Sequence, residues 1–454
     1  MADGGMIEII EYDTKRINKR VQEVISRGNL YFPDIDIEVR AIVDAVRDMG
    51  DEVLVKLTEE FDGVSISPSS FRIPPSTIEA AYEKVDAEFL LALQESIQNI
   101  TRYHENELMR PFRLEEGDGV SLEERVSPIE KVGLYVPGGK AIYPSSIVMN
   151  AVPAKVAGVS RIVVMTPPKN SADNPHVLVT FGELGLKEVY TLGGAQAIAA
   201  LAFGTETVPK VDKIIGPGNI YVALAKRYVY GVVDIDMIAG PSEVVVLADD
   251  SADPMFIAAD LLAQSEHDQM ATAICITTSL RLGKEVEAEI ARQIKMLRRQ
   301  RIVAESLKNH GAIIVVKTLE EGIELVNLIA PEHLELMTQN PRRCLRKVKN
   351  AGAIFLGAYS PVPVGDYLAG PSHVLPTGGT ARYSSPLSVY DFVKRSSIIE
   401  YSKGKIQKKG TLIRRLASVE GLEGHARAIE VREKGGSSPD LPVDANGGLN
   451  EKSA

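Results

Sequence analysis

The stretch VYTLGGAQAIAALAFG, residues 189–204, decides the fold class. It opens with a short apolar run, passes through two glycines, and continues as an alanine- and leucine-rich run of helical length. A second stretch, KIIGPGNIYVALAKRYV at 213–229, repeats this order of strand, glycine turn and helix. A strand that turns directly into a helix is the repeating unit of α/β proteins with parallel sheets.

Similar apolar runs extend this pattern in both directions from the opening stretch. The further predicted buried strands are IVVMTPP (162–168), VVVLAD (244–249), AICITTS (273–279), AIIVVK (312–317) and AIFLG (353–357). Helical patterns separate most of them, and residues 36–62 and 76–108 are also predicted to be helical. We therefore expect an α/β protein with largely parallel sheets, followed by a smaller mixed unit at 387–433.

Composition limits the possible function classes. A chain of 454 residues can form two or three domains, and its net charge of −10 argues against a nucleic-acid or anionic-membrane binder. No apolar run approaches the ~18 residues that suggest a membrane span, and the acidic start MADGGMIEIIEYD does not resemble a signal peptide. The two cysteines form no CxxC pair, so a cytoplasmic location without disulfides is expected.

The stretch AQSEHDQM places two polar side chains at the end of an apolar helical pattern. A helix should begin at Asp253-Pro254, a capping residue followed by a proline suited to the first turn. Gln264 then falls on the apolar face and His267 lies one turn further on. Two interpretations stay open: a hydrogen-bonded pair at a helix end, or two metal ligands on adjacent turns.

Five more polar residues occur in apolar or Gly/Pro-rich settings. Glu332 and His333 in LIAPEHLEL are either an acid–base pair on a short turn or a helix start with a surface histidine. Asp366 in SPVPVGD is either a carboxylate displayed by a loop or a turn cap. Glu420 and His425 flank the turn GLEG, which is either part of a site or only a turn before a helix. The remaining histidines His104, His176 and His310 are expected on the surface.

Glycine-rich turns supply a second signal. TLGGAQAIAAL and IIGPGNIYVAL place glycines between a strand and a helix, where exposed backbone amides can bind phosphate. The sequence contains no GxGxxG, so dinucleotide binding and close strand–helix packing remain equally open explanations.

Taken together, these motifs closely resemble the histidinol dehydrogenase family. The match follows the family's order over most of residues 35–432, and includes VGLYVPGGKAIYPSSIVMNAVPAKVAGV, DMIAGPSEVVVLAD, DLLAQSEHD, NLIAPEHLEL, VPVGDYLAGPSHVLPTGG and VEGLEGHARAI. The resemblance implies two incomplete Rossmann-like domains, one inserted in the other, with small helical terminal segments. The implied boundaries are 1–30 for an N-terminal segment, 31–134 with 244–387 for the first domain, 135–243 for an NAD-binding domain, 388–434 for a C-terminal domain contributing to the partner's active site, and 435–454 for a disordered tail.

The resemblance also implies the site residues. One zinc ion per subunit would be held by Gln264, His267, Asp366 and, from a partner subunit, His425, so a homodimer with shared active sites is expected. Glu332 and His333 would be the acid–base pair. Substrate would contact Ser242, His373 and Glu420 besides His333 and the zinc ligands, and NAD would contact Tyr135, Gln196 and Asn219.

The implied reaction is the zinc-dependent oxidation of L-histidinol to L-histidine through L-histidinaldehyde, with two NAD⁺, at the end of histidine biosynthesis. Three rivals remain: a related dehydrogenase acting on another polyol or amino alcohol, a metal-dependent hydrolase in which Glu332 activates water, and a non-catalytic binding protein. A cysteine nucleophile for the aldehyde step is not expected, because Cys275 sits in a strand-like run as a small buried hydrophobe. Cys344 has basic neighbours that could lower its pKa, but nothing places it near the other residues.

Overall fold

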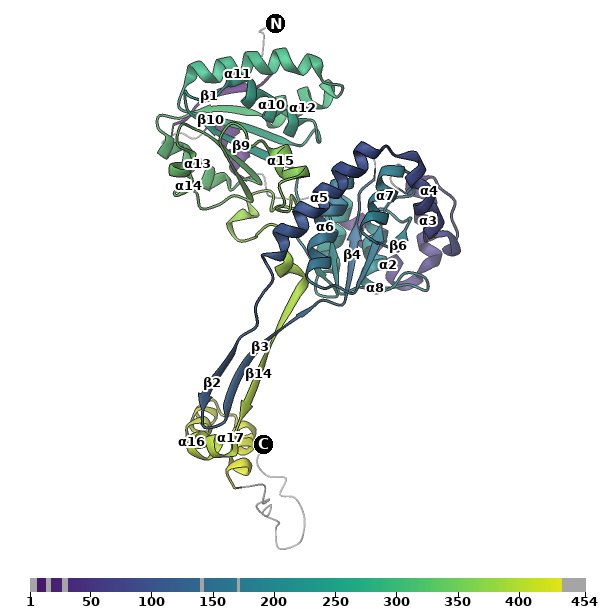
Figure 1. The fold of residues 1–454 in the computed structure, drawn as a ribbon, viewed down its shortest axis with the longest axis vertical. Helices are drawn as coiled ribbons and strands as arrows, with labels where there is room; N and C mark the ends of the chain where they lie inside the picture. The colour runs from purple at the N-terminus through teal and green to yellow at the C-terminus, as the bar shows by residue number, and fades with distance from the viewer. Residues whose placement is uncertain (1–5, 14–17, 27–31, 139–142, 170–171, 435–454) are drawn as a thin grey trace. The chain divides into compact units, whose positions relative to one another are not determined.

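The chain divides into two compact units. The computed structural model describes residues 6–13, 18–26, 32–138, 143–169 and 172–434. The larger unit comprises Met1–Leu108 with Pro128–Phe392, and the smaller unit Met109–Ser127 with Val393–Ala454. Within its described part, the larger unit contains two parallel sheets, which define a five-stranded lobe and a six-stranded lobe (Figure 1).

The five-stranded lobe has the strand order 3-2-1-4-5, which is that of a Rossmann fold without its sixth strand. Its parallel strands are β4 (Lys131–Tyr135), β5 (Arg161–Met165), β6 (Glu188–Tyr190), β7 (Lys213–Ile215) and β8 (Asp234–Ile235), in the order β6-β5-β4-β7-β8. Helices α6 (Pro144–Val156), α7 (Pro175–Glu183), α8 (Gly194–Phe203) and α9 (Ile220–Val229) connect them. The two strand–turn–helix stretches predicted from the sequence are confirmed, with α8 almost wholly buried as its alanine-rich composition requires.

The N-terminal helices complete this lobe. They are α2 (Pro33–Met49), α3 (Asp51–Asp62), α4 (Pro75–Ala81) and α5 (Ala87–Glu105). Val39 of α2 and Leu54 of α3 share a hydrophobic core with Ile198 of α8, and Ile100 of α5 packs in the core that contains Ile147 of α6. The family resemblance implied a different grouping, residues 31–134 with 244–387, and that grouping stays a prediction; the cores described here place the N-terminal helices beside the five-stranded sheet.

The six-stranded lobe repeats the Rossmann order and adds one strand. Its parallel strands are β1 (Glu8–Glu11), β9 (Glu243–Ala248), β10 (Thr272–Thr277), β11 (Ala312–Val315), β12 (His333–Met337) and β13 (Ala353–Leu356), in the order β1-β11-β10-β9-β12-β13. One face packs against α10 (Pro254–Ser265), α11 (Leu280–Gln293), α12 (Gln300–His310) and α15 (Val362–Tyr367). The other packs against α1 (Lys19–Ser26), α13 (Leu319–Ile329) and α14 (Pro341–Leu345).

Each sheet contains strands that the sequence prediction missed. Two of the missed strands, β4 and β12, lie in the interior of their sheets. Their sequences KVGLY and HLELM interrupt the apolar run with glycine or charged residues. The seven strands that were predicted all occur, within a few residues of their expected bounds. The Rossmann-like fold class is therefore confirmed.

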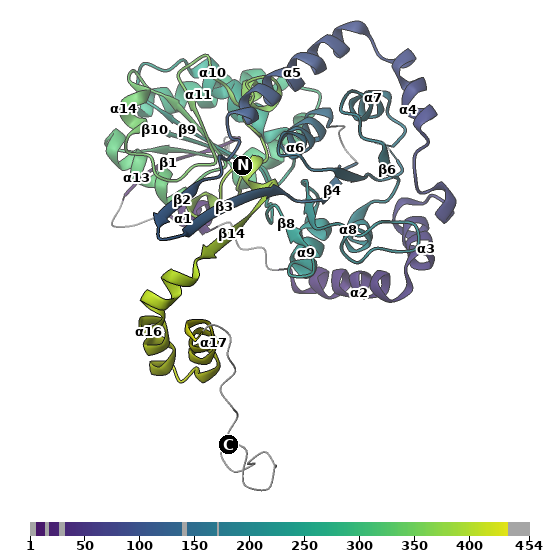
Figure 2. The ribbon, with the colours of Figure 1, turned by 60° about the horizontal axis from the view of Figure 1, so that its bottom comes forward.

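The smaller unit combines an antiparallel hairpin with two helices. Strands β2 (Arg113–Gly117), β3 (Val120–Pro128) and β14 (Val393–Tyr401) form a sheet in the order β14-β3-β2, and α16 (Lys403–Val419) packs against α17 (Glu423–Glu433) (Figure 2). This unit includes the small C-terminal mixed unit expected from the sequence, and it also takes in residues 109–127. The expected disordered tail at 435–454 lies outside the described residues.

Short 3₁₀ turns occur between several of the longer helices and strands. The 3₁₀ turns are η1 (Pro68–Ser70), η2 (Tyr82–Lys84), η3 (Ile294–Met296), η4 (Thr380–Arg382) and η5 (Val389–Phe392). Among the helices in the described ranges, none has both the length and the apolar composition needed to cross a bilayer.

Candidate functional site

The expected acid–base pair lies at the amino end of strand β12, beside the amino end of its neighbour β9. Glu332 directly precedes β12, His333 is its first residue, and Ser242 directly precedes the adjacent strand β9. His333 pairs in register with Val244 of β9, so the backbone of the pair is fixed by the sheet. The alternative of a helix start with a surface histidine is wrong, because His333 is a strand residue and only 5% exposed. The acid–base pair stays a prediction, with His333 on a strand and not on a turn.

A second carboxylate, Glu243, organises this pair. The Glu243 N–H donates to Glu332 Oε2 at 2.7 Å, and the Glu332 N–H donates to Glu243 Oε1 at 3.0 Å. The carbonyl of Glu243 lies 3.0 Å from His333 Nδ1. Sequence reasoning missed Glu243, although a carboxylate opening the buried run EVVVLA was an available signal, since such a group needs buried partners.

The contact with Glu243 assigns the tautomer of His333. A carbonyl can only accept, so Nδ1 carries the proton and Nε2 has a free lone pair. Nε2 is buried without a hydrogen-bond partner. Burial, with smaller contributions from the nearby His373 and His267, lowers the pKa of His333 to about 4, although the hydrogen bond to the Glu243 carbonyl acts in the opposite direction. His333 is thus a neutral imidazole at neutral pH, able to accept a proton at Nε2.

The residues expected to bind zinc are only partly brought together. Gln264 lies in the last turn of α10, is 3% exposed, and has a buried Nε2 with no partner. His267 is not on the next helical turn as expected, because α10 ends at Ser265. His267 as a whole is exposed, but the protein around its imidazole partly removes the ring from water and lowers its pKa. His267 is close enough to His333 and His373 to influence the pKa of both.

Asp366 and His373 have strongly shifted pKa values. Burial raises the pKa of Asp366 to about 7 and lowers that of His373 to about 4. Asp366 lies inside the short helix α15, not on an irregular loop as one interpretation held. A buried carboxylate without a cation is costly, so its surroundings suit a positive partner.

The structure does not assemble a complete metal cluster. In the described part of the chain, no three or more His, Cys, Asp or Glu residues are grouped so that they could hold a metal ion. Of the expected ligands, His425 lies in α17 and is exposed on the smaller unit, as is Glu420 at the end of α16. Of the four expected ligands, Gln264, His267 and Asp366 lie on the larger unit, and their nitrogen and oxygen donors are of the kind that zinc accepts.

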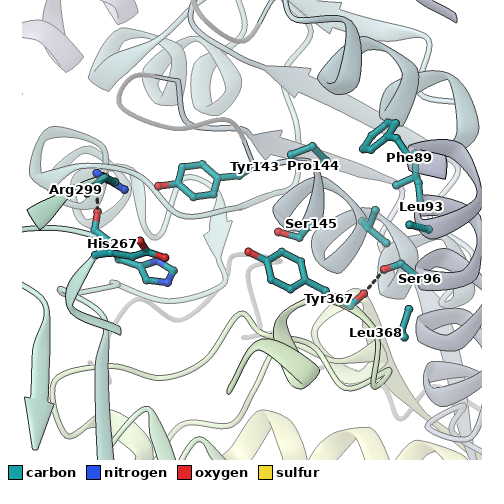
Figure 3. Close-up of a pocket in the computed structure, with 13 residues that line it drawn as sticks. Phe89, Leu93, Ser96, Tyr143, Pro144, Ser145, His267, Arg299, Tyr367 and Leu368 are labelled. Carbon is teal, nitrogen blue, oxygen red and sulfur yellow. Dashed lines mark hydrogen bonds between the residues drawn. The ribbon is translucent and has the colours of Figure 1, made fainter. Parts of the chain in front are cut away.

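A cavity of about 510 Å³ lies beside His267. Its wall includes Ser96 of α5, Tyr143 before α6, Arg299 and Tyr367 (Figure 3). Ser96 Oγ donates to the carbonyl of Tyr367 at 2.6 Å. This volume is large enough for a small polar metabolite, and it has aromatic walls with a few polar groups, as ligand pockets commonly do.

The expected NAD residues lie at the carboxyl edge of the five-stranded sheet. Tyr135 ends β4, Gln196 is in the first turn of α8, and Asn219 caps α9 by accepting from the Val222 N–H at 3.2 Å. The Tyr135 hydroxyl accepts from the Gly194 N–H at 3.0 Å, and burial raises its pKa to about 12. Strands β4 and β7 border the point where the strand order reverses, which is where Rossmann-type sheets bind dinucleotides.

A buried ion pair holds the glycine turn at this edge. Lys226 of α9, 2% exposed, pairs with Asp236 and donates to the carbonyl of Gly216 at 3.0 Å. Asp236 Oδ2 in turn accepts from the Gly216 N–H at 2.8 Å. Gly216 has φ of +109°, and a Cβ there would lie 2.1 Å from the Tyr135 carbonyl oxygen. Only glycine fits this turn, which explains a glycine-rich stretch that lacks GxGxxG.

Three further residues test the sequence interpretation. His104 was expected on the surface but is fully buried, because the last turn of α5 folds inward and His104 Nδ1 lies 2.7 Å from Glu107 Oε2. Cys275 is buried in β10 as expected, and burial raises its pKa to about 12. Cys344 is buried too, so its basic neighbours do not make it an exposed thiol.

The fold and the site define a class of enzyme with Rossmann-type lobes. Enzymes of this class combine a neutral histidine that can act as a base with a glycine-rich sheet edge of the kind that binds dinucleotides. Comparison with known proteins makes this specific. The histidinol dehydrogenase family model matches residues 25–433. The chain is 55% identical over 395 residues to the histidinol dehydrogenase of Halalkalibacterium halodurans, covering 87% of this chain and 93% of that one. It is 51% identical over 426 residues to that of Bacillus cereus, covering 94% and 99%.

A solved structure agrees with these relatives. The crystal structure of histidinol dehydrogenase from Elizabethkingia anophelis superposes with a TM-score of 0.89 at 35% identity, covering 95% of this chain and 99% of that one. The chain belongs to the histidinol dehydrogenase family, and is an oxidoreductase of histidine biosynthesis.

Proposed function

We propose that this protein oxidises L-histidinol to L-histidine through L-histidinaldehyde, using two NAD⁺ and one zinc ion per subunit. The single observation that carries the proposal is His333, a buried neutral imidazole whose Nδ1 is engaged and whose Nε2 is free. A base of this kind can remove the proton of an alcohol when hydride leaves the adjacent carbon.

The roles of the other residues follow from their chemistry. Gln264, His267 and Asp366 would hold zinc with His425 of a second subunit, and the unpartnered amide of Gln264 and the buried carboxyl of Asp366 fit a nearby cation and its bound ligand. Zinc, when bound, would anchor a substrate that carries imidazole and amine nitrogens. NAD⁺, when bound beside Tyr135, Gln196 and Asn219, would accept the hydride.

The chain's own groups then act in sequence. His333 Nε2 takes the hydroxyl proton in the first oxidation. Glu332, held by the Glu243 N–H, orients and deprotonates water for hydration of the aldehyde. Once His333 has released its first proton to solvent, its Nε2 takes a second proton as the hydrate is oxidised. Ser242, His373 and Glu420 would contact the substrate. The observations on Cys275 support this water route, since a fully buried thiol with a pKa near 12 is a poor nucleophile.

Homodimer formation is part of the proposal. Leu412, Leu416 and Val419 of α16 are exposed and follow helical spacing, so the smaller unit carries an apolar stripe that a second copy could cover. A cytoplasmic location stays a prediction based on cysteine usage.

The main test is the number of NADH molecules formed per L-histidinol, with zinc, after chelation and after zinc is restored. Two NADH, lost on chelation and regained with zinc, support the proposal. One NADH would remove the hydration role of Glu332. No NADH with zinc present would favour a related dehydrogenase for another alcohol, and hydrolysis of a substrate without NAD⁺ would favour the hydrolase.

His333→Asn should lower kcat by about 10²–10⁴-fold, the usual contribution of a general base. The matched control is His310→Asn, in α12 outside the site, which should leave kcat unchanged.

A second experiment tests the shared active site. His333→Asn and His425→Asn are each expected to be inactive. After dissociation and mixing, a heterodimer contains one site with both native histidines, so about one quarter of wild-type activity should return. No recovery, with heterodimers demonstrated by differential tagging, would place His425 in the site of its own subunit.

A further inference from the structure

Glu335 is a carboxylate in the middle of a buried central strand. It lies in β12, in register with Val246 of β9 and Phe355 of β13, and is 1% exposed. Inner strands of parallel sheets are covered on both faces and are normally apolar throughout. A glutamate at this position needs a specific set of partners.

Its partners come from two other elements. Glu335 Oε1 accepts from the N–H of Val362, the first residue of α15, at 3.0 Å. The side chain of Asp260 in α10 lies close enough to Glu335 for each carboxyl group to influence the pKa of the other. Glu335 Oε2 is buried and has no hydrogen-bond partner among the described residues. Two carboxyl groups can hydrogen-bond only if one of them carries a proton, and that proton would give the pair its missing donor.

The environment favours such a shared proton. Burial raises the pKa of Asp260 to about 6, and burial with the repulsion of Asp260 raises the pKa of Glu335 well above its ordinary value. No other titratable side chain contributes to either shift. Two carboxylates this close in a buried setting cannot both be ionised without a large cost, so the pair retains one proton.

The three linked elements are those that carry the proposed site. Asp260 lies one helical turn before Gln264 on α10. Val362 lies one turn before Asp366 on α15. Glu335 lies two residues after His333, and therefore on the same face of β12. A single buried side chain thus joins the supports of two expected zinc ligands and of the expected base.

We infer that Glu335, hydrogen-bonded to Asp260 and to the Val362 N–H, is a positioning residue that holds α10, α15 and β12 in the arrangement that Gln264, Asp366 and His333 require. This inference rests on the proposed function. Glu335 contacts neither substrate nor cofactor in this role, and it acts only through the elements it connects. Residues that orient metal ligands in this way commonly contribute 10–100-fold to metal affinity.

Zinc affinity, measured by competition with a chelator, tests the inference on the full-length protein. Glu335→Leu keeps the buried volume but removes both hydrogen bonds, and should raise the zinc dissociation constant by about 10–100-fold. Glu335→Gln can still accept from Val362 and donate to an ionised Asp260, so it should stay within about threefold of wild type. The surface control Glu324→Leu, in α13, should match wild type. Unchanged affinity in Glu335→Leu, or equal losses in the leucine and glutamine variants, would overturn the inference.

Infrared spectroscopy of the metal-free protein gives an independent readout. The wild-type-minus-variant difference spectrum at pH 7 should contain a protonated-carboxyl band for both Glu335→Gln and Asp260→Asn, since each amide replaces the shared proton as donor. Absence of that band from both spectra would overturn the shared proton, even if Glu335→Leu fails to fold. If wild type binds no zinc and forms no NADH from histidinol, the proposed function fails instead, and the infrared result still decides whether the carboxyl pair exists.

Discussion

Replacing Lys226 by methionine should destabilise the five-stranded lobe strongly. The substitution keeps most of the side-chain volume but removes the partner of Asp236, whose side chain is 1% exposed. It also removes the donor to the Gly216 carbonyl. Breaking a buried ion pair from one side usually costs about 3–5 kcal/mol, because the remaining charge is left buried.

The expected value lies near the lower end of that range. Asp236 retains the N–H groups of Gly216 and Met237, at 2.8 and 2.6 Å, and these continue to stabilise its charge. We therefore expect a loss of about 3 kcal/mol in the free energy of unfolding. The Michaelis constant for NAD⁺ should also rise, because the turn at Gly216 would lose the hydrogen bond to its carbonyl.

Urea unfolding followed by far-UV circular dichroism is the suitable assay, since the chain has no tryptophan for fluorescence. The double variant Lys226→Met with Asp236→Asn is the control: it leaves no unpaired charge, and should be more stable than Lys226→Met alone. A loss below about 1 kcal/mol in Lys226→Met, or a double variant that is no more stable, would refute the reasoning.

Three further outcomes are expected. Gly216→Ala should cost more than about 2 kcal/mol in urea unfolding, since its Cβ would clash with the Tyr135 carbonyl at a φ of +109°; a loss like that of Gly231→Ala, which meets open space at a similar φ, would contradict the clash. Raised folded-state pKa values contribute stability that is complete below the unfolded values and is lost as pH rises through the folded ones. Wild type should therefore lose stability relative to Glu335→Gln as pH rises from 4 to 7, because the unfolded chain ionises Glu335 while burial and Asp260 hold its folded-state pKa well above the ordinary value; a constant difference across that range would argue against the shared proton. Cys275 should react with thiol reagents only in denaturant, because its burial and its pKa near 12 leave almost no thiolate, and rapid native-state labelling would contradict the buried assignment.

The sequence predicted what depends on local pattern. The helix start at Asp253-Pro254 is confirmed, with the Asp253 side chain accepting from the Met255 N–H at 2.8 Å. The strand–turn–helix units at 189–204 and 213–229 are confirmed as well, since their apolar runs and glycines are contiguous.

What depends on contacts between distant segments could not be predicted in the same way. The strand position of His333 follows from pairing with Val244 and Ala353, and the sequence HLELM alone does not show it. Its charged neighbours predicted that His104 lies on the surface. It is buried instead, and its Nδ1 contacts the carboxylate of Glu107. The roles of Glu243 and Glu335 could not be predicted, because a single carboxylate in an apolar run indicates no function until its hydrogen-bond partners are known.

The pairing of β1 with β11 has a consequence for synthesis of the chain. Strand β1 is made first, but its register partners begin at Ala312. Ribosomes add about 5–20 residues per second, so β1 waits on the order of tens of seconds, while the contiguous five-stranded lobe can already fold. An apolar strand exposed for that time is a natural site for chaperone binding, and the slow step in producing this enzyme should be the return of its own first strand.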